Sequence, residues 1–444
     1  MEPLLASAFY ALLLEFGQHF TAPSARNFVD MTAGWILALG RRTVTSVIVA
    51  SGQAGERDHS IYHRFFSRAV WSWNALCVQL IQLVDALVPE GVALVAAVDD
   101  TLARKGGKHI AAAGMHHDPL LSTRSTARLH FGHVWVVLSL VVPMPWGAHV
   151  AIPVLWALHW PKKQCKRWKL AYRTKTELAV DLYATLALAL PHRRIVLLGD
   201  MLYSNSTTLG NLPEGWDLVG RMPMNAALYA PVPPRQPGQK GRPRKKGPRL
   251  PSPQDVADCA AFPWETLKLR LYRKKVTLKI KVFEAIWYTG HQTEMLRIVV
   301  VRDPSGNWHD GAYYTTELDM GPTAILQTYS LRWPLEQTFR DVKQELGFED
   351  PQNRTPKAVE RTAPMALFLH ALVCIWYCQF CNVDQPRFSR LAPWYRQKSQ
   401  PSFADMLAAL RRASWTERLS ANPGFTPDLL KCLEPLLACL DRAA

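Results

Sequence analysis

The chain has 444 residues, which is enough for two or three domains and a large core. Its 48% hydrophobic and 20% charged residues are typical of a globular protein. Lys and Arg (52) exceed Asp and Glu (36), so the net charge of +16 predicts a polyanionic partner, with nucleic acid favoured over a membrane surface. No run of about 18 uncharged apolar residues occurs, and the apolar N-terminus lacks a basic leader, so we expect neither a membrane span nor a secretory signal.

Residues 1–90 have apolar residues at three- and four-residue spacing, which predicts helices. A segment at 41–48 is followed by a Gly-bearing connection and by the basic and aromatic segment 59–68. This pattern is compatible with a helical DNA-binding domain in which Arg64 and Arg68 contact DNA. The connection is longer than an ordinary helix-turn-helix turn, and a bundle that packs on the next domain explains the pattern equally well.

The next segment, 91–224, predicts the first part of an α/β core. Residues 92–98 are continuously apolar, as in a strand buried on both faces, and Asp99 and Asp100 follow them. Two more strands are predicted at 133–142 and 148–158, a helix at 176–190, and a buried strand at 194–199 that ends in Asp200. Three strands, a helix and a strand, with acids after the first and fourth strands, are typical of a ribonuclease-H-like core. A single Asp after a strand is more often a turn residue, but two such placements point to a site.

Residues 215–224 could supply the fifth strand, and 225–312 predict a β-rich insertion. Strands are expected within 267–287, 296–301 and 312–316, with a turn at 303–306. The insertion contains a Pro-rich loop at 231–253, which we expect to be mobile. Its Gly-Arg-Pro resembles an AT-hook core, but Lys240 replaces the preferred Arg, so phosphate contact is favoured over minor-groove reading. The cations expected to make that contact are Arg242, Arg244, Lys245 and Lys246.

The second part of the core, 313–385, contains four polar residues at fixed spacing: Tyr329, Arg332, Glu336 and Lys343. In one continuous helix they fall within a sector of about 60°. Pro334 either kinks that helix or starts it, and in the second case Tyr329 and Arg332 lie on a preceding turn. For an arbitrary helix, a solvated face with ion pairs is the simpler explanation.

The later part of the chain is helical. An apolar helix is expected at 363–380, and a basic helical tail at 386–444. Cys374, Cys378 and Cys381 lie in or next to the apolar helix, with no His pair at zinc-finger spacing, so we interpret them as core residues in a reducing cytosol.

The spacing Tyr-x2-Arg-x3-Glu-x6-Lys is similar to the signature of the IS4-like superfamily of DDE transposases. Arg-Trp-Pro-Leu-Glu around Glu336, with residues 393–396 and 401–407, resembles the IS701 branch. The resemblance implies that Asp99, Asp200 and Glu336 are catalytic carboxylates that hold two Mg²⁺ ions, with Mn²⁺ as an alternative. The residues alone do not show whether Asp99 or Asp100 is the metal ligand. The resemblance also implies that Arg332 and Lys343 bind phosphates and that Tyr329 positions an end nucleotide.

The function implied is a DNA transposase of an insertion sequence, which cuts double-stranded DNA at terminal inverted repeats and joins the ends to target DNA. We expect a homodimer on DNA in a prokaryotic cytoplasm. Some relatives flip a base into an aromatic pocket of the insertion, where Trp308 and Tyr313 lie here, although core aromatics are the simpler interpretation. Two alternatives stay open: a ribonuclease-H-like nuclease without strand transfer, and a non-catalytic DNA-binding derivative.

Overall fold

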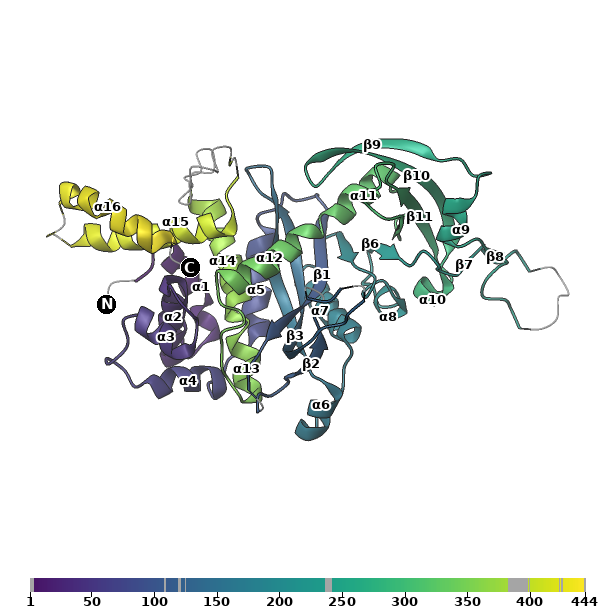
Figure 1. Ribbon diagram of the computed structural model, residues 1–444. Helices are drawn as coiled ribbons and strands as arrows, with labels where there is room; N and C mark the ends of the chain where they lie inside the picture. Colours follow the sequence, from purple (N-terminus) through teal and green to yellow (C-terminus); the bar gives the residue numbers. More distant parts are fainter. Residues whose placement is uncertain are drawn as a thin grey trace.

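A single mixed β-sheet of twelve strands runs through most of the molecule (Figure 1). At one end of the sheet lie the N-terminal and C-terminal helices, and at the other a β-rich arm extends outwards (Figure 1). The computed structural model describes residues 4–107, 109–118, 121–123, 125–235, 242–381, 398, 400–422, 424 and 426–442.

Five strands form the centre of the sheet, in the order β4-β3-β1-β5-β6. β1 is antiparallel to β3 and β3 to β4, whereas β5 runs parallel to both β1 and β6. This arrangement confirms the predicted ribonuclease-H-like α/β class. Their bounds are Leu94–Arg104 for β1, Leu129–Pro143 for β3, His149–His159 for β4, Ile195–Gly199 for β5 and Trp216–Met222 for β6.

The first strand is longer than predicted. Asp99 and Asp100 do not end β1, because the buried residues Thr101 to Ala103 carry the strand on to Arg104 along its pairing with β3. The parallel pairing with β5, however, stops at Ala97. The two aspartates therefore lie where the sheet opens between β1 and β5, which is the position that the prediction required of them.

Helices cover both faces of this centre. α7 (Lys175–Ala189) begins with a capping box between Thr174 and Glu177 and packs on β3 and β4. On the opposite face lie α12 (Trp333–Gln344) and α14 (Met365–Phe380), and α5 (Trp73–Asp85) also packs on β4. The stretch Pro356–Phe380 is apolar and long enough to cross a membrane by composition, but 83% of its most apolar window is buried inside the protein, so it is a core helix.

The N-terminal helices pack on the core rather than standing apart from it. α1 (Ser7–Glu15), a 3₁₀ turn (Phe16–His19), α2 (Ala22–Leu37), α3 (Val44–Ala50) and α4 (His59–Ser67) share one hydrophobic core with α14. The ring of Phe16, for example, lies 5.1 Å from that of Phe368. Arg361, at the end of α13 (Pro356–Thr362), donates to the carbonyls of Ala69 and Trp71. The helical content expected for 1–90 is therefore present.

The insertion continues the same sheet. β12 (Gly311–Thr315) pairs with β6 on one side and with β11 (Met295–Arg302) on the other, and β10 (Lys274–Ile286) follows. β10 also pairs with β9 (Glu265–Leu271), and the turn predicted at 303–306 joins β11 to β12. The remaining elements here are β7 (Leu228–Tyr229), β8 (Arg249–Leu250), α9 (Pro253–Asp258) and α10 (Tyr288–His291).

Several short elements were not predicted: β2 (Gly114–His117), α6 (Lys162–Trp168) and α8 (Ser206–Leu209). After α11 (Pro322–Ser330) and the core helices, the chain ends in α15 (Phe403–Ala421) and α16 (Pro427–Arg442). α15 is tied to the N-terminal helices because the buried guanidinium of Arg411 donates to the carbonyls of Ile36 (2.7 Å) and Ala38 (3.2 Å). Of the residues used for the IS701 resemblance, 393–396 lie outside the described residues.

Candidate active site

Two of the three predicted carboxylates meet at one guanidinium. Nη1 of Arg332 donates to Oδ2 of Asp99 at 2.6 Å, and Nη2 of the same side chain donates to Oε1 of Glu336. Asp99 comes from the centre of the sheet and Glu336 from the first turn of α12. Charge-assisted hydrogen bonds of this kind are among the stronger ones in proteins, so Arg332 fixes the spacing of both acids.

The backbone around Arg332 explains why it can reach both acids. α11 ends at Ser330, Arg332 is the N-cap residue of α12, and Pro334 lies in the first turn of that helix. Pro334 therefore starts a helix, which is the second of the two possibilities left open above. Tyr329 and Arg332 lie before α12, and Glu336 is placed in its first turn, where the helix dipole favours a carboxylate.

Asp99 and Asp100 point to opposite faces of the sheet, as neighbours on a strand must. Asp99 faces Arg332 and α12, whereas Asp100 accepts hydrogen bonds from Lys175 Nζ (2.7 Å) and from the Tyr203 hydroxyl (3.2 Å). Lys175 is the first residue of α7, on the other side of the sheet. Asp99 therefore shares a face of the sheet with Glu336, and Asp100 lies on the other face.

Asp200 follows β5 directly, as predicted. Its Oδ1 atom accepts hydrogen bonds from the backbone N–H groups of Leu202 (2.8 Å) and Tyr203 (3.3 Å), so Asp200 also shapes the turn after the strand. Tyr203, three residues after Asp200, is completely buried, which holds this turn against the core. The role of Asp200 in the turn is therefore compatible with a role in the predicted site.

The charge of Asp99 is influenced by its surroundings and by the neighbouring Asp200. Burial raises the pKa of Asp99 to about 7, the Arg332 guanidinium opposes that rise, and the carboxylates of Asp200 and Asp100 add to it. Burial also lowers the pKa of Arg332, but Asp99 and Glu336 outweigh this effect and raise it above its ordinary value. A pKa shifted by burial and by specific neighbouring charges is a common feature of functional sites.

The residues present suit a hard divalent cation. Carboxylate oxygens from neighbouring elements are the donors that Mg²⁺ and Mn²⁺ prefer, and Asp99, Asp200 and Glu336 supply them. In the part of the chain that the structure describes, no three His, Cys, Asp or Glu side chains are gathered closely enough to hold one ion. The geometry thus brings Asp99 and Glu336 together through Arg332, with Asp200 nearby but not in the same close cluster.

The other two residues of the motif lie in different surroundings. The Tyr329 ring lies 4.8 Å from that of Tyr313, and burial raises the pKa of Tyr329 to about 12. Lys343 lies two turns beyond Glu336, half-buried near Glu349, and burial lowers its pKa. A cleft of about 370 Å³ beside Tyr329 is lined in part by Arg221, Tyr272, Trp308 and Tyr313.

The predicted DNA-contacting cations of the loop fall into two groups. Arg242, Arg244 and Lys245 are exposed. Lys246 is half-buried, with its Nζ atom 3.8 Å from the centre of the Tyr229 ring and 4.8 Å from that of Tyr288. Lys246 therefore helps to hold the base of the loop, where β7 pairs with β8. Gly241, which is the glycine of the AT-hook-like Gly-Arg-Pro, lies outside the described residues, and so do the five residues before it.

In the N-terminal region, the aromatic side chains of α4 are buried and its arginines face outwards. Tyr62, Phe65 and Phe66 belong to the core, whereas Arg64 and Arg68 are exposed. The buried rings explain part of the pattern that suggested a DNA-binding helix. The exposed positions of the two arginines leave them available for contacts with a phosphate backbone.

Sequence reasoning did not single out Lys175, Arg221 or Tyr272, which surround the predicted site. Lys175 neutralises the aspartate on the far face of β1, and Arg221 and Tyr272 line the aromatic cleft. Lys175 lies within the capping box of Thr174 and Glu177, so its position at a helix start could be predicted, but its partner could not. The other two are set by strand pairing inside the insertion.

A protein-family model described as DDE superfamily endonuclease matches residues 15–279 of the chain. Because this match spans more than half of the chain, the protein belongs to that family. It is accordingly a transposase-like nuclease with DNA as substrate. The matched range contains Asp99 and Asp200 and ends before Glu336. A comparison with curated proteins finds no significant match.

Proposed function

We propose that this DDE superfamily endonuclease is the transposase of an insertion sequence, similar to the IS4-like superfamily and its IS701 branch. The supporting observation is the pairing of Asp99 and Glu336 through Arg332, with Asp200 beside them at the open edge of the sheet. The enzyme would cut DNA at the ends of the element and join them to target DNA by hydrolysis and transesterification.

Asp99, Asp200 and Glu336 would hold the divalent ions, which, when bound, activate the attacking water or 3′-hydroxyl and stabilise the leaving oxygen. The chain's own residues prepare this site before DNA arrives. Arg332 neutralises part of the charge of Asp99 and Glu336, which keeps these two partly buried carboxylates close together at a tolerable cost. With Asp99 and Glu336 holding divalent ions, the Arg332 guanidinium would be available to pair with a phosphate of the DNA.

The positions of Tyr329 and of the aromatic cleft support a role in DNA-end binding. The cleft opens beside the motif, and Trp308, Tyr272 and Tyr313 present ring surfaces with Arg221 among them. Rings and a guanidinium suit an unpaired nucleotide, which stacks on the former and pairs its phosphate with the latter. Lys343, Arg64, Arg68 and the exposed loop cations would add sequence-independent phosphate contacts.

The protein is expected to act in the cytoplasm of a prokaryotic cell, as a homodimer when it binds two DNA ends. The decisive experiment supplies the purified chain with Mg²⁺ and a plasmid that carries the element's terminal repeats. Excised ends joined to a second plasmid would support the transposase. Cut but unjoined ends, under conditions where 3′-hydroxyls are available, would favour the alternative of a ribonuclease-H-like nuclease without strand transfer, because both use the same three acids.

A further inference from the structure

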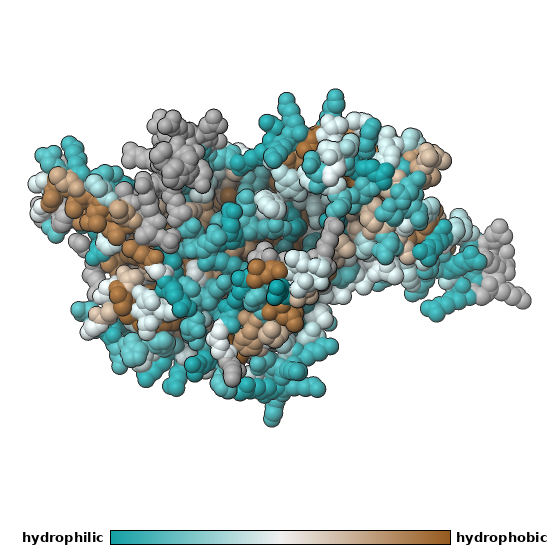
Figure 2. Space-filling model, viewed as in Figure 1, coloured by the Kyte–Doolittle hydropathy of each residue, from teal (hydrophilic) through white to brown (hydrophobic). Residues whose placement is uncertain are grey.

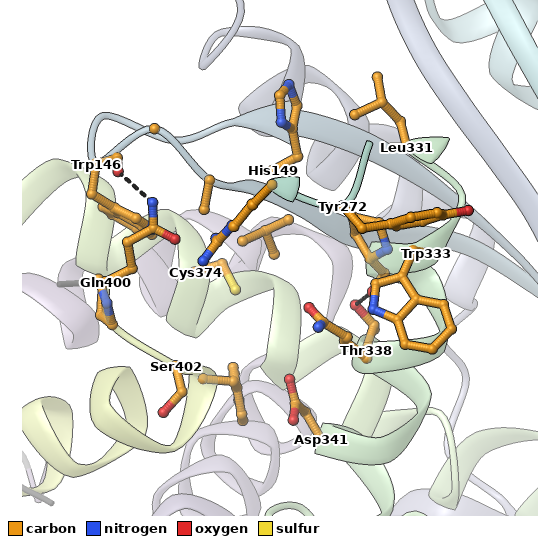
Figure 3. Close-up of a pocket in the computed structure, with 18 of the residues that line it drawn as sticks. Trp146, His149, Tyr272, Leu331, Trp333, Thr338, Asp341, Cys374, Gln400 and Ser402 are labelled. Carbon is orange, nitrogen blue, oxygen red and sulfur yellow. Dashed lines mark hydrogen bonds between the residues drawn. The ribbon is translucent and has the colours of Figure 1, made fainter. Parts of the chain in front are cut away.

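A large cleft lies on the side of α12 that does not carry Glu336 (Figure 3). Its volume is about 980 Å³, and its lining comes from six parts of the chain: the β9–β10 hairpin, the turn between β3 and β4, the end of α11, α12, α14, and the start of α15. Figure 3 shows Tyr272 and Trp333 side by side at one end, His149 on one wall, and Cys374 from α14 near its floor. We call it the hairpin cleft.

The hairpin cleft is cationic. Arg270 and Arg273 on the hairpin line it together with Arg340 of α12. Asp341 is the only acid among the described residues that line it, and it lies 3.8 Å from Arg340, whereas Arg270 and Arg273 have no acidic partner in the described parts of the chain. Two guanidiniums without counter-charges on the wall of a cleft favour an anionic ligand.

The hairpin itself is built at some energetic cost. Arg270 lies directly opposite Lys275 on the paired strands, and like charges in that position destabilise a sheet. The turn consists of Tyr272 and Arg273, with φ values of 48° and 66°, a conformation that usually requires Gly or Asn. The strained turn and the pairing of like charges both hold side chains of the hairpin at the cleft. An anion bound beside Arg270 would reduce the repulsion between Arg270 and Lys275.

The shape and chemistry of the cleft fit DNA better than a small anion. Tyr272 and Trp333 are each about half exposed, and their ring centroids are 6.1 Å apart. Extended cationic walls with exposed rings at one end suit a sugar–phosphate chain, which presents charges at regular spacing and apolar surface between them. Gln327 and Gln337 add neutral donors to the lining.

We propose that the hairpin cleft binds the sugar–phosphate backbone of DNA beyond the segment held at the carboxylates. This inference rests on the proposed function only in taking DNA as the ligand. DNA would then contact α12 on two sides, with the reacting phosphate near Glu336 and a neighbouring stretch between α12 and the β9–β10 hairpin. Either a duplex or a separated strand presents this backbone.

The test compares the salt dependence of binding, without any divalent metal, for wild type and Arg270→Gln/Arg273→Gln. Probes are a mixed-sequence 30-base-pair duplex and one of its strands alone. The control, Lys163→Gln/Lys166→Gln, removes two charges from α6, which Figure 1 places at the opposite extreme of the molecule. Loss of two phosphate contacts lowers the slope of log K against log salt by about 1.8 on the duplex or about 1.4 on the single strand.

A decrease on the duplex supports the proposal and assigns duplex DNA to the cleft, and a decrease confined to the single strand supports it and assigns a separated strand. Slopes equal to those of the control on both probes overturn it. A benzophenone side chain in place of Arg273 should also cross-link to DNA, whereas one in place of Lys166 should not. Because neither readout requires cleavage, failure of the nuclease assay would leave this result intact, and the reverse also holds.

Discussion

Arg332 and Asp99 are 233 residues apart in the chain, yet Nη1 of the first lies 2.6 Å from Oδ2 of the second. The contact joins the entry to α12 with the centre of the sheet, and through the second hydrogen bond of Arg332 it includes Glu336. An internal cation therefore holds the two carboxylates in place before any other cation binds.

Glu336→Gln should abolish Mg²⁺-dependent DNA cleavage and leave DNA binding intact. The substitution keeps the size of the side chain and removes a charged oxygen donor, so we expect a loss of about 10³-fold or more in the single-turnover rate, which corresponds to several kcal/mol. The matched control is Glu294→Gln on an exposed turn. Cleavage at the wild-type rate in Glu336→Gln would remove this residue from the active site.

Arg332→Gln should strengthen the binding of a divalent cation to the DNA-free protein. The guanidinium competes for Asp99 and Glu336 and repels a second cation, so its loss should lower the Kd for Mn²⁺, measured by electron paramagnetic resonance, at least about tenfold. Arg173→Gln, which removes an exposed arginine paired with Asp181, serves as the control. An unchanged or weaker Mn²⁺ affinity would show that Arg332 does not oppose the cation.

Asp341→Asn should change how stability depends on pH. Burial raises the pKa of Asp341 to about 7, partly opposed by Arg340, whereas in the unfolded chain it returns to an ordinary value near 4. The folded state then binds the proton more tightly, so the stability from this group is complete below about pH 4 and is lost as the pH rises through about 7.

Between pH 5 and 8 the free energy of unfolding of the wild type should therefore fall, by up to about 2.7 kcal/mol from this group, because the change of about 1.4 kcal/mol per pH unit stops near pH 7. The Asp341→Asn variant should lose correspondingly less over the same range. Urea unfolding at each pH measures the difference, with the exposed Asp319→Asn as control. Parallel pH profiles for wild type and Asp341→Asn would contradict the shift.

Substitutions of the cations in the Pro-rich loop should have two different effects, one on DNA binding and one on the structure of the loop. Replacing Arg242, Arg244 and Lys245 by Gln should lower the salt slope of DNA binding by about 2.7 if each contacts one phosphate. Lys246→Gln should instead loosen the base of the loop, because its ammonium lies over the rings of Tyr229 and Tyr288. Faster hydrogen exchange at Tyr229 and Ala230 in Lys246→Gln would report this change. An unaltered slope in the triple variant would show that the loop does not touch DNA.

The sequence predicted the elements that have a simple periodicity. Buried strands such as β5 and the apolar helix α14 can be predicted from the sequence because nearly every position in them is apolar. The end of β1 was misplaced because two aspartates look like a strand end, although the residues after them are buried again. The β9–β10 turn was not predicted, since Tyr272 and Arg273 carry none of the usual turn residues.

The sequence suggested residues for the candidate site, but it did not indicate how they are arranged. The spacing of the motif identified Arg332 and Glu336, but it assigned Arg332 to phosphate and gave no sign that it would reach Asp99. Contacts over such sequence distances depend on how α12 is laid across the sheet. The role of Lys246 was missed for the same reason, because Tyr288 approaches it only after the strands of the insertion have paired.

The direct pairing of β12 with β6 has a mechanical consequence. An arm joined to the core by a continuous ladder of backbone hydrogen bonds cannot swing like a hinged jaw without breaking that ladder. We therefore expect the distance between the carboxylates and the tip of the arm to stay nearly constant when DNA binds. If a straight double helix does not fit this fixed spacing, the DNA has to bend or otherwise deform in order to contact both the carboxylates and the arm.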